Sequence, residues 1–285
     1  MRICHTSADM RAACGELRRA GRTLGLVPTM GALHAGHMSL VAAATAACDA
    51  VAASIFVNPT QFGPKEDYAA YPRTFEEDCR KLEQEGVDLV FAPAAAEMYP
   101  PGNSTFVDPG EIGGRLDGAS RPGHFRGVAT IVTRLFNIVQ PERAYFGQKD
   151  AAQVAVLRHV VRDLNLAVEL VICPIVREPD GLAMSSRNRY LSSVERERAL
   201  ALSQALQAAA ELVRSGEESA EAILHLLRTF LARVPDVRLD YVAVVDPDSL
   251  LPVTNVSTGA LIAIAAWVGT TRLIDNLLLQ RHQVP

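Results

Sequence analysis

The sequence of 285 residues lacks the features that would assign it to several special classes of protein. No apolar run approaches the roughly 18 residues of a membrane-spanning helix, and no charged start followed by an apolar segment marks an export signal. The five cysteines are scattered and form no C-x-x-C pair, which argues against a disulfide framework and a zinc site. They are Cys4, Cys14, Cys48, Cys79 and Cys173. We therefore expect an unexported protein of the reducing cytoplasm.

An excess of charge of either sign is also missing. The formal net charge is −4, charged residues make up 21% of the chain and apolar residues 49%. This composition is that of an ordinary globular protein and gives no global reason to expect nucleic-acid or membrane binding. An anionic substrate must then be held by a local positive site.

Short β-rich runs alternate with helical patterns in the first part of the chain. The predicted strands are 24–27, 51–57, 88–91, 143–146 and 168–173, and the predicted helices are 37–48, 74–85, 127–139 and 151–164. Such alternation predicts a parallel sheet covered on both faces. Because ligands of these sheets bind beyond the carboxyl ends of the strands, we expect the functional residues in the loops that follow the strands.

The pattern changes after about Arg177. Helices are predicted at 193–214 and 220–233, followed by extended segments at 238–245, 260–267 and 272–279. Elements that no longer alternate indicate a separate α+β unit. We therefore predict an α/β domain over residues 1–176 and a smaller α+β domain over residues 177–285. A hinge near Arg177 would let the smaller domain close as a lid.

The segment Leu26–Ser39 begins within the first predicted strand, at 24–27, and leads into the helix predicted at 37–48. A glycine-containing turn before a helix is a common anion site, because the first backbone N–H groups of the helix lack partners within the helix. The spacing from Gly31 to Gly36 resembles a P-loop, but His37 stands where the phosphate-binding lysine would be. His34 and His37 are therefore candidate donors to a phosphate; the alternative is that they only cap the helix.

The loop after the second predicted strand carries two amide side chains. Asn58 and Gln61 belong to Asn58–Pro64, in which two prolines and a glycine fix the path of the backbone. Amides hydrogen-bond hydroxyls and carboxylates without adding charge, which suits a polar uncharged or anionic substrate. A simple Asx turn with Gln61 in solvent explains the same residues equally well.

The loop Gly147–Asp150 places a lysine at the entrance to a helix. Lys149 adds a full cation to the field of the helix dipole, which suits a polyphosphate. Asp150 either caps the helix or binds Mg²⁺ beside the phosphates. Gln153 lies one helical turn further and is a candidate for the same cleft.

Two hydroxyls and an arginine follow the fifth predicted strand. Ser185, Ser186 and Arg187 combine neutral and cationic donors, a common way to hold the β- and γ-phosphates. The alternative is a serine turn that caps the next helix.

The loop Arg121–Gly127 contains Arg121, His124 and Arg126 just before a helix. Two explanations are open for it: a clamp for an anion, or arginines paired with nearby carboxylates at the surface.

The order of these motifs along the chain resembles one family. PTMGALHAGH, FVNPTQFGP with YPRT, RPGHFRGV, FGQKD with Gln153, and GLAMSSRNRYLS occur in this order, and together they are similar to the pantothenate synthetase family. The departures are small: Ala35 and Met38 stand where the family often has Glu and Leu, and Gln148 and Ala151 where Glu and Tyr are common.

The resemblance implies a fold and a reaction. The family belongs to the H-x-G-H nucleotidylyltransferase superfamily, which implies an α/β fold with a Rossmann-like doubly wound parallel sheet. Its members join (R)-pantoate to β-alanine with ATP and Mg²⁺, through pantoyl adenylate, releasing pyrophosphate and AMP. They are usually homodimers.

Residue roles follow from the same resemblance. His34, His37 and Lys149 are the expected catalytic residues. Gln61 and Gln153 are expected to bind pantoate. Asn58 is expected to be a further substrate-binding residue and, with Asp150, to lie near the magnesium and the phosphates. The residues expected to contact ATP are Met30, Gly31, Ala32, Leu33, His34, Ala35, Gly36, His37, Gly147, Gln148, Lys149, Asp150, Val176, Met184, Ser185, Ser186 and Arg187.

Two other functions compete with this one. A nucleotidylyltransferase with a phosphorylated acceptor would share the H-x-G-H motif but would need a cationic pocket for the second phosphate. A non-catalytic nucleotide-binding protein would have a degenerate site, whereas every polar motif residue is present here.

Overall fold

The computed structural model describes residues 1–64 and 66–280. Contacts divide the chain into two compact units. The N-terminal unit consists of Met1–Gly114, Arg121–Gln148 and Val156–Pro174. The C-terminal unit consists of Arg115–Ser120, Lys149–Ala155 and the chain from Ile175 onward. Residues 281–285 of the predicted C-terminal domain lie outside the described residues.

A six-stranded parallel sheet forms the centre of the N-terminal unit, which confirms the predicted α/β fold. Its strands, in chain order, are β1 (Arg2–Cys4), β2 (Leu24–Thr29), β3 (Ala50–Ile55), β4 (Leu89–Phe91), β5 (Arg143–Gly147) and β6 (Glu169–Cys173). They lie in the order β1-β4-β3-β2-β5-β6. The direction of winding therefore reverses between β2 and β5, and the crevice at such a reversal is the usual ligand site of this fold.

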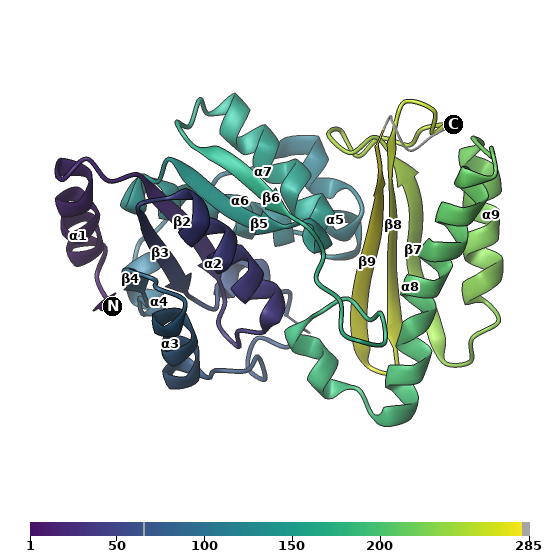
Figure 1. Ribbon diagram of the computed structural model, residues 1–285, viewed down its shortest axis with the longest axis horizontal. Coiled ribbons are helices and arrows are strands. Elements are labelled where there is room, and N and C mark those ends of the chain that lie inside the picture. The colour runs from purple at the N-terminus through teal and green to yellow at the C-terminus, as the bar shows by residue number, and fades with distance from the viewer. Residues whose placement is uncertain (65, 281–285) are drawn as a thin grey trace. The chain divides into compact units, whose positions relative to one another are not determined.

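Helices cover both faces of this sheet (Figure 1). They are α1 (Ser7–Arg19), α2 (Ala35–Ala47), α3 (Phe75–Gln84), α4 (Ala95–Met98), α6 (His124–Val139) and α7 (Ala151–Asp163), with 3-10 turns η1 (Pro59–Gln61) and η2 (Gly110–Gly114). The helices α2 and α3 contact each other, as do α1 and α6. Right-handed crossovers place these two pairs on opposite faces. Both sheet faces are thus buried, which explains why every residue of β3 except Ile55 is buried.

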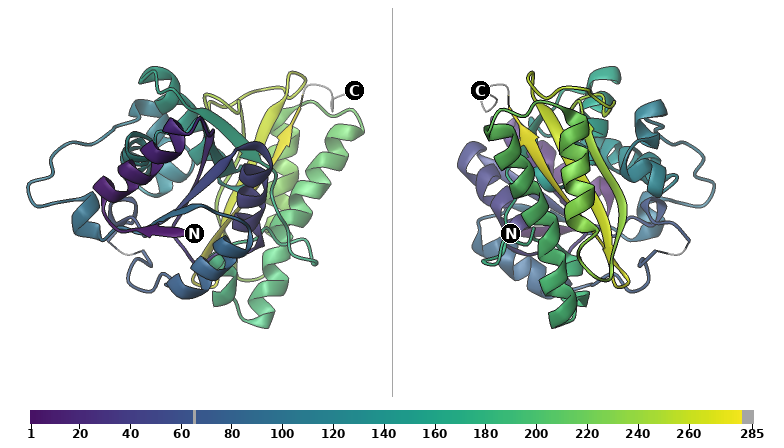
Figure 2. Two further views of the ribbon diagram at one scale, coloured as in Figure 1. Left: turned by 60° about the vertical axis from the view of Figure 1, so that its left-hand side comes forward. Right: turned by 90° about the vertical axis from the view of Figure 1, so that its right-hand side faces the viewer.

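The C-terminal unit is an α+β unit built on a three-stranded antiparallel sheet of β7 (Val237–Val245), β8 (Ala260–Val268) and β9 (Thr271–Leu279). It also contains α5 (Asp117–Ser120), η4 (Ser186–Tyr190), α8 (Ser193–Arg214) and α9 (Ala220–Leu231), together with Lys149 and Asp150 of the 3-10 turn η3 (Gln148–Asp150). Figure 2 shows α8 and α9 together over one face of this sheet. Their apolar side chains and those of the central strand β8 form its core. A capping box at Ser192 and Glu195 fixes the start of α8.

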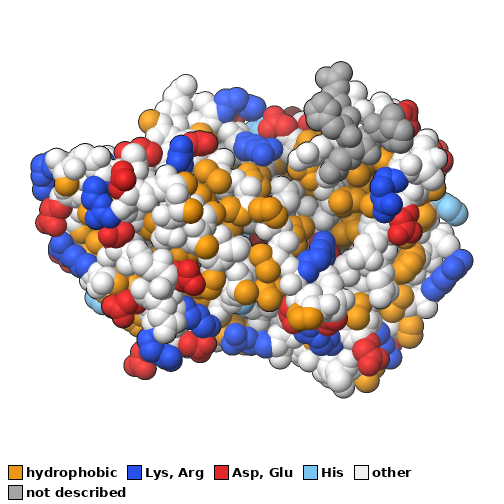
Figure 3. Space-filling model, in the orientation of Figure 1, with side chains coloured by type: hydrophobic (Ala, Val, Ile, Leu, Met, Phe, Trp, Pro, Cys, Tyr) orange, Lys and Arg blue, Asp and Glu red, His pale blue; other side chains and the backbone are white. Residues whose placement is uncertain are grey.

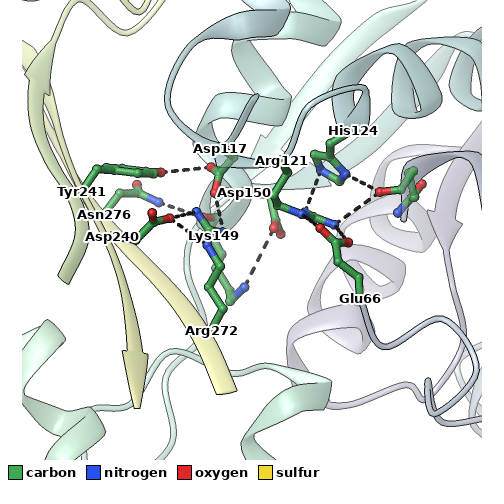
Figure 4. A network of polar contacts seen from close by, with 11 residues as sticks. Glu66, Asp117, Arg121, His124, Lys149, Asp150, Asp240, Tyr241, Arg272 and Asn276 are labelled. Carbon is green, nitrogen blue, oxygen red and sulfur yellow. Dashed lines mark hydrogen bonds and ion pairs between the residues drawn. The ribbon is translucent and has the colours of Figure 1, made fainter. Parts of the chain in front are cut away.

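A buried ionic cluster joins α5 to the strands of this unit (Figure 4). The Arg272 guanidinium lies 2.8 Å from an Asp117 oxygen and 2.7 Å from an Asp240 oxygen. The Tyr241 hydroxyl donates to Asp117, 3.0 Å away. Burial raises the pKa of Tyr241, and the nearby Asp117 charge raises it further, so the phenol stays protonated. The segment Arg115–Ser120 is therefore a fixed part of the C-terminal unit.

The surface charge agrees with the near balance of the sequence. On the face shown in Figure 3, the Lys and Arg side chains lie singly among Asp and Glu side chains. Among residues 1–64 and 66–280, no helix combines the length and the apolar character needed to cross a bilayer.

Candidate active site

The loop that connects β2 to α2 is folded around a buried carboxylate. Gly31 has a φ of 81° and Ala32 a φ of 51°, both in the left-handed region. The Asp78 side chain of α3 is fully buried and accepts hydrogen bonds from the backbone N–H groups of Ala32 and Leu33, each at 2.8 Å. A left-handed alanine is unfavourable by itself, so the carboxylate holds the loop in this shape.

The two histidines of the motif close the first turn of α2. The Gly36 N–H donates to Nδ1 of His34 at 3.1 Å, and the His34 N–H donates to Nδ1 of His37 at 3.3 Å. Because each Nδ1 accepts a hydrogen bond, the proton of each neutral ring is on Nε2. The ring centroids are 4.0 Å apart. The capping that we considered as an alternative is therefore real, and it orients both imidazoles as Nε2 donors.

This geometry changes one part of the sequence argument. We expected unpartnered backbone N–H groups to hold a phosphate at the start of α2. Instead, the N–H groups of Ala32, Leu33, His34 and Gly36 already have acceptors within the protein. The physical reason is that the Asp78 carboxylate and the two imidazoles already accept hydrogen bonds from these N–H groups. Binding of an anion at this position would therefore depend on the imidazoles and the helix dipole.

Asp78 is a residue that the sequence argument missed, and its replacement gives a clear expectation. In Asp78→Asn, an NH₂ group that cannot accept replaces one carboxylate oxygen, so one buried loop N–H loses its partner. We expect a loss of about 1–3 kcal/mol in the free energy of unfolding. ATP binding should weaken as the loop loosens. Thermal unfolding and ATP titration measure the two effects.

The neighbouring carboxylate of the same helix provides the matched control. Glu76 is exposed, so Glu76→Gln should leave both measurements unchanged. An Asp78→Asn variant as stable as the unaltered chain would contradict the role given to Asp78.

The loop after β3 holds its two amide side chains together. Asn58 is 1% exposed, and its Nδ2 donates to Oε1 of Gln61 at 3.0 Å and to the Gly127 carbonyl at 3.2 Å. Its Oδ1 accepts from the hydroxyl of Tyr99 at 2.8 Å. Gln61 Nε2 lies 3.0 Å from the sulfur of Met30. Asn58 therefore has the geometry of a group that positions Gln61, and Gln61 lies beside Met30, one of the residues expected to contact ATP.

Lys149 lies in the 3-10 turn directly before α7, at the helix entrance where the sequence placed it. Its Nζ is 3.9 Å from a carboxylate oxygen of Asp150, which is half exposed. The backbone carbonyl of Lys149 accepts from Nδ2 of Asn276 at 2.9 Å, and Asn276 is buried in β9. The C-terminal sheet thus fixes the backbone from which this ammonium group extends.

The segment from Val176 to Arg187 folds back on itself. The Met184 N–H donates to the Val176 carbonyl at 3.0 Å, which brings these two predicted nucleotide contacts together. Ser185 Oγ accepts from the Arg187 N–H at 3.2 Å and caps η4. Ser185 therefore forms the capping turn that we considered as an alternative. The candidate phosphate donors Ser186 and Arg187 follow it directly in the chain.

Among residues 1–64 and 66–280, no group of three or more His, Cys, Asp or Glu side chains is arranged to hold a metal ion. Mg²⁺ bound with a nucleotide needs only one or two carboxylates beside the phosphates, and the half-exposed Asp150 fits that requirement.

Comparison with known proteins shows which family this chain resembles. The family model described as pantoate-beta-alanine ligase matches residues 2–278. The pantothenate synthetase of Acidobacterium capsulatum is 59% identical over 290 residues, covering 98% of this chain and 97% of the relative. That of Thermotoga neapolitana is 56% identical over 279 residues, covering 98% of this chain and 100% of the relative.

Solved structures agree with these relatives. The crystal structure of pantothenate synthetase from Thermus thermophilus has a TM-score of 0.92 at 48% identity, covering 98% of this chain and 100% of that one. The pantoate-beta-alanine ligase of Francisella tularensis, complexed with beta-gamma ATP and beta-alanine, has a TM-score of 0.79 at 33% identity, covering 98% of this chain and 97% of that one. The chain described here therefore belongs to the pantoate-beta-alanine ligase family.

Proposed function

We propose that this chain condenses (R)-pantoate with β-alanine, using ATP, to form pantothenate. The observation that carries the proposal is the match to this family from residue 2 to residue 278, with each of the motifs retained. The relative from Francisella tularensis, complexed with beta-gamma ATP and beta-alanine, supports the choice of substrates. The protein is a ligase that forms a carbon–nitrogen bond and acts in pantothenate biosynthesis.

The reaction proceeds in two steps. The pantoate carboxylate attacks the α-phosphate of ATP, which forms pantoyl adenylate and releases pyrophosphate. The β-alanine amine then attacks the acyl carbon of this mixed anhydride, and AMP leaves. Both steps build negative charge on phosphate or carbonyl oxygens, where preorganised donors have their largest effect.

The residues of the first step are assigned by the chemistry of their donors. His34 and His37 offer Nε2–H groups to the transferred phosphate, and Lys149 offers its ammonium group. Ser185, Ser186 and Arg187 hold the departing phosphates. The backbone of the loops at residues 30–37, 147–150, 176 and 184 borders the nucleotide.

Pantoate recognition is assigned to the amide side chains. Gln61 and Gln153 hydrogen-bond the hydroxyl and carboxylate of pantoate, since an amide offers both a donor and an acceptor. Asn58 holds Gln61 in place through its bond to Oε1.

Three further properties belong to the same proposal. Mg²⁺ neutralises the phosphates of ATP when it is bound, with Asp150 beside it. The protein acts as a homodimer, as its family resemblance implies. It works in the cytoplasm, where a reducing environment suits five free cysteines.

An amide-forming assay tests the reaction directly. Purified protein is incubated with ATP, Mg²⁺, D-pantoate and β-alanine, and AMP and pantothenate are followed by mass spectrometry. We expect both products in equal amounts, with dependence on all three substrates and loss of activity when EDTA removes the metal.

The other outcomes identify the rival functions. Pyrophosphate release without pantothenate would leave a nucleotidylyltransferase of the H-x-G-H type with a different acceptor. Binding of ATP with no turnover would instead indicate a degenerate, non-catalytic site.

A further inference from the structure

Glu66, Arg121 and His124 form a cluster at the start of α6. None of the three is among the residues proposed to contact ATP or pantoate. The Arg121 guanidinium forms two parallel bonds to the Glu66 carboxylate, Nε to Oε1 at 2.7 Å and a terminal nitrogen to Oε2 at 2.6 Å (Figure 4). Burial would raise the pKa of Glu66, but the hydrogen bonds and charge of Arg121 outweigh it and lower that pKa. Such a two-point contact fixes the plane of the guanidinium group.

The fixed guanidinium determines how His124 is protonated. A terminal nitrogen of Arg121 lies 3.0 Å from Nε2 of His124. Arginine only donates, so Nε2 accepts and the ring proton is on Nδ1. That Nδ1 lies 2.8 Å from the backbone carbonyl of Gln61 and therefore donates to it. A second donor, from Arg121, reaches the same carbonyl at 3.3 Å.

The next turn of α6 touches the same loop directly. A Cβ atom on Gly127 would lie 2.4 Å from the carbonyl oxygen of Thr60 and 2.7 Å from the backbone nitrogen of Gln61. Only glycine permits this approach. Residues 124 and 127 are three positions apart and so share one face of the helix. The turn η1 is therefore fixed by α6 at two successive points.

From these contacts we propose that Arg121 and His124, oriented by Glu66, are positioning residues for the pantoate-binding side chain of Gln61. They act on the backbone carbonyl of Gln61, so they set where its amide group lies without touching the substrate. A displacement of about 1 Å at a binding group can cost about a hundredfold in rate. The inference rests on the proposed contact between Gln61 and pantoate.

Substitutions at His124 separate the donor from the bulk of the ring. His124→Leu removes both hydrogen bonds, whereas in His124→Asn the Nδ2 group lies where Nδ1 was and still donates to Gln61. We expect His124→Leu to raise the KM for pantoate by about tenfold to a hundredfold, with the KM for ATP and the Tm nearly unchanged. His124→Asn should restore most of the pantoate affinity.

A second histidine–arginine pair supplies the control. His159 and Arg162 of α7 also lie three residues apart, with His159 Nδ1 3.0 Å from the Arg162 guanidinium, and they belong to another helix than the residues that hold Gln61. His159→Leu should therefore leave the KM for pantoate unchanged. Arg121→Lys keeps the charge but loses the two-point contact, so it should give an intermediate increase.

Comparing the His124 variants with Gln61→Ala distinguishes a failure of this inference from a failure of the proposed function. If Gln61→Ala raises the KM for pantoate while His124→Leu does not, positioning by His124 is overturned and the function stands. If His124→Asn behaves as His124→Leu does, or if the KM values for pantoate and for ATP rise together with a fall in Tm, the cluster only stabilises the fold and the inference is wrong. If Gln61→Ala itself has no effect on pantoate, the assignment of Gln61 fails, and the inference with it.

Discussion

Replacing His37 by alanine is expected to slow formation of the adenylate by about a hundredfold to a thousandfold while the chain remains folded. The ring accepts from the backbone of the same turn through Nδ1, so the ring proton is on Nε2, the group that we propose as donor to the phosphate. Release of pyrophosphate in the presence of pantoate, without β-alanine, measures this step alone.

Two amide substitutions separate the cap from the catalytic donor. In His37→Asn, Oδ1 takes the place of Nδ1 and keeps the hydrogen bond from His34, but no group remains at the position of Nε2. In His37→Gln, Nε2 keeps that donor and the cap is lost. We expect His37→Asn to be as slow as His37→Ala, and His37→Gln to be faster. Near-normal rates in both His37→Ala and His37→Asn would remove this histidine from the mechanism.

Replacing Lys149 by methionine should reduce adenylate formation by a similar factor of about a hundred to a thousand. Methionine has nearly the same length and shape but no charge. The carbonyl of residue 149 keeps its bond from Asn276, because that bond does not involve the side chain. The loss therefore reports on the ammonium group.

Arginine at the same position provides the comparison. Lys149→Arg keeps the positive charge but presents a planar fork in place of a compact cation, so a partial rate is expected. Single-turnover pyrophosphate release compares the two. A Lys149→Met variant with more than about a tenth of the normal rate would place the lysine outside the transition state.

Much of the fold could be predicted from the sequence, because strands buried on both faces and amphipathic helices leave strong local patterns. The second strand was predicted at 51–57 and lies at Ala50–Ile55, and the helix predicted at 193–214 has those bounds. The elements β1 and α1 were missed. A three-residue edge strand leaves no periodic pattern, and α1 buries only Met10, Ala13 and Cys14.

The site was predicted less completely, because its supporting contacts join distant parts of the chain. Asp78 follows Glu76 and Glu77, so it is indistinguishable in the sequence from a solvated acidic first turn. Its burial depends on how α3 packs beneath the loop after β2. The pairing of Glu66 with Arg121 spans 55 residues and leaves no local signal either. It confirms that Arg121 pairs with a carboxylate, one of the two explanations left open, although the pair is partly buried and does not lie at the surface.

The assignment of Lys149–Ala155 to the C-terminal unit limits how this protein can be divided or recombined. The segment lies in the middle of the chain, between β5 and the remainder of α7, yet its backbone is held by Asn276 near the end of β9. A fragment cut after residue 176 would keep the lysine but lose that support. Exchange of the C-terminal unit between relatives must therefore transfer three separate stretches of sequence, so a single crossover does not produce an intact hybrid.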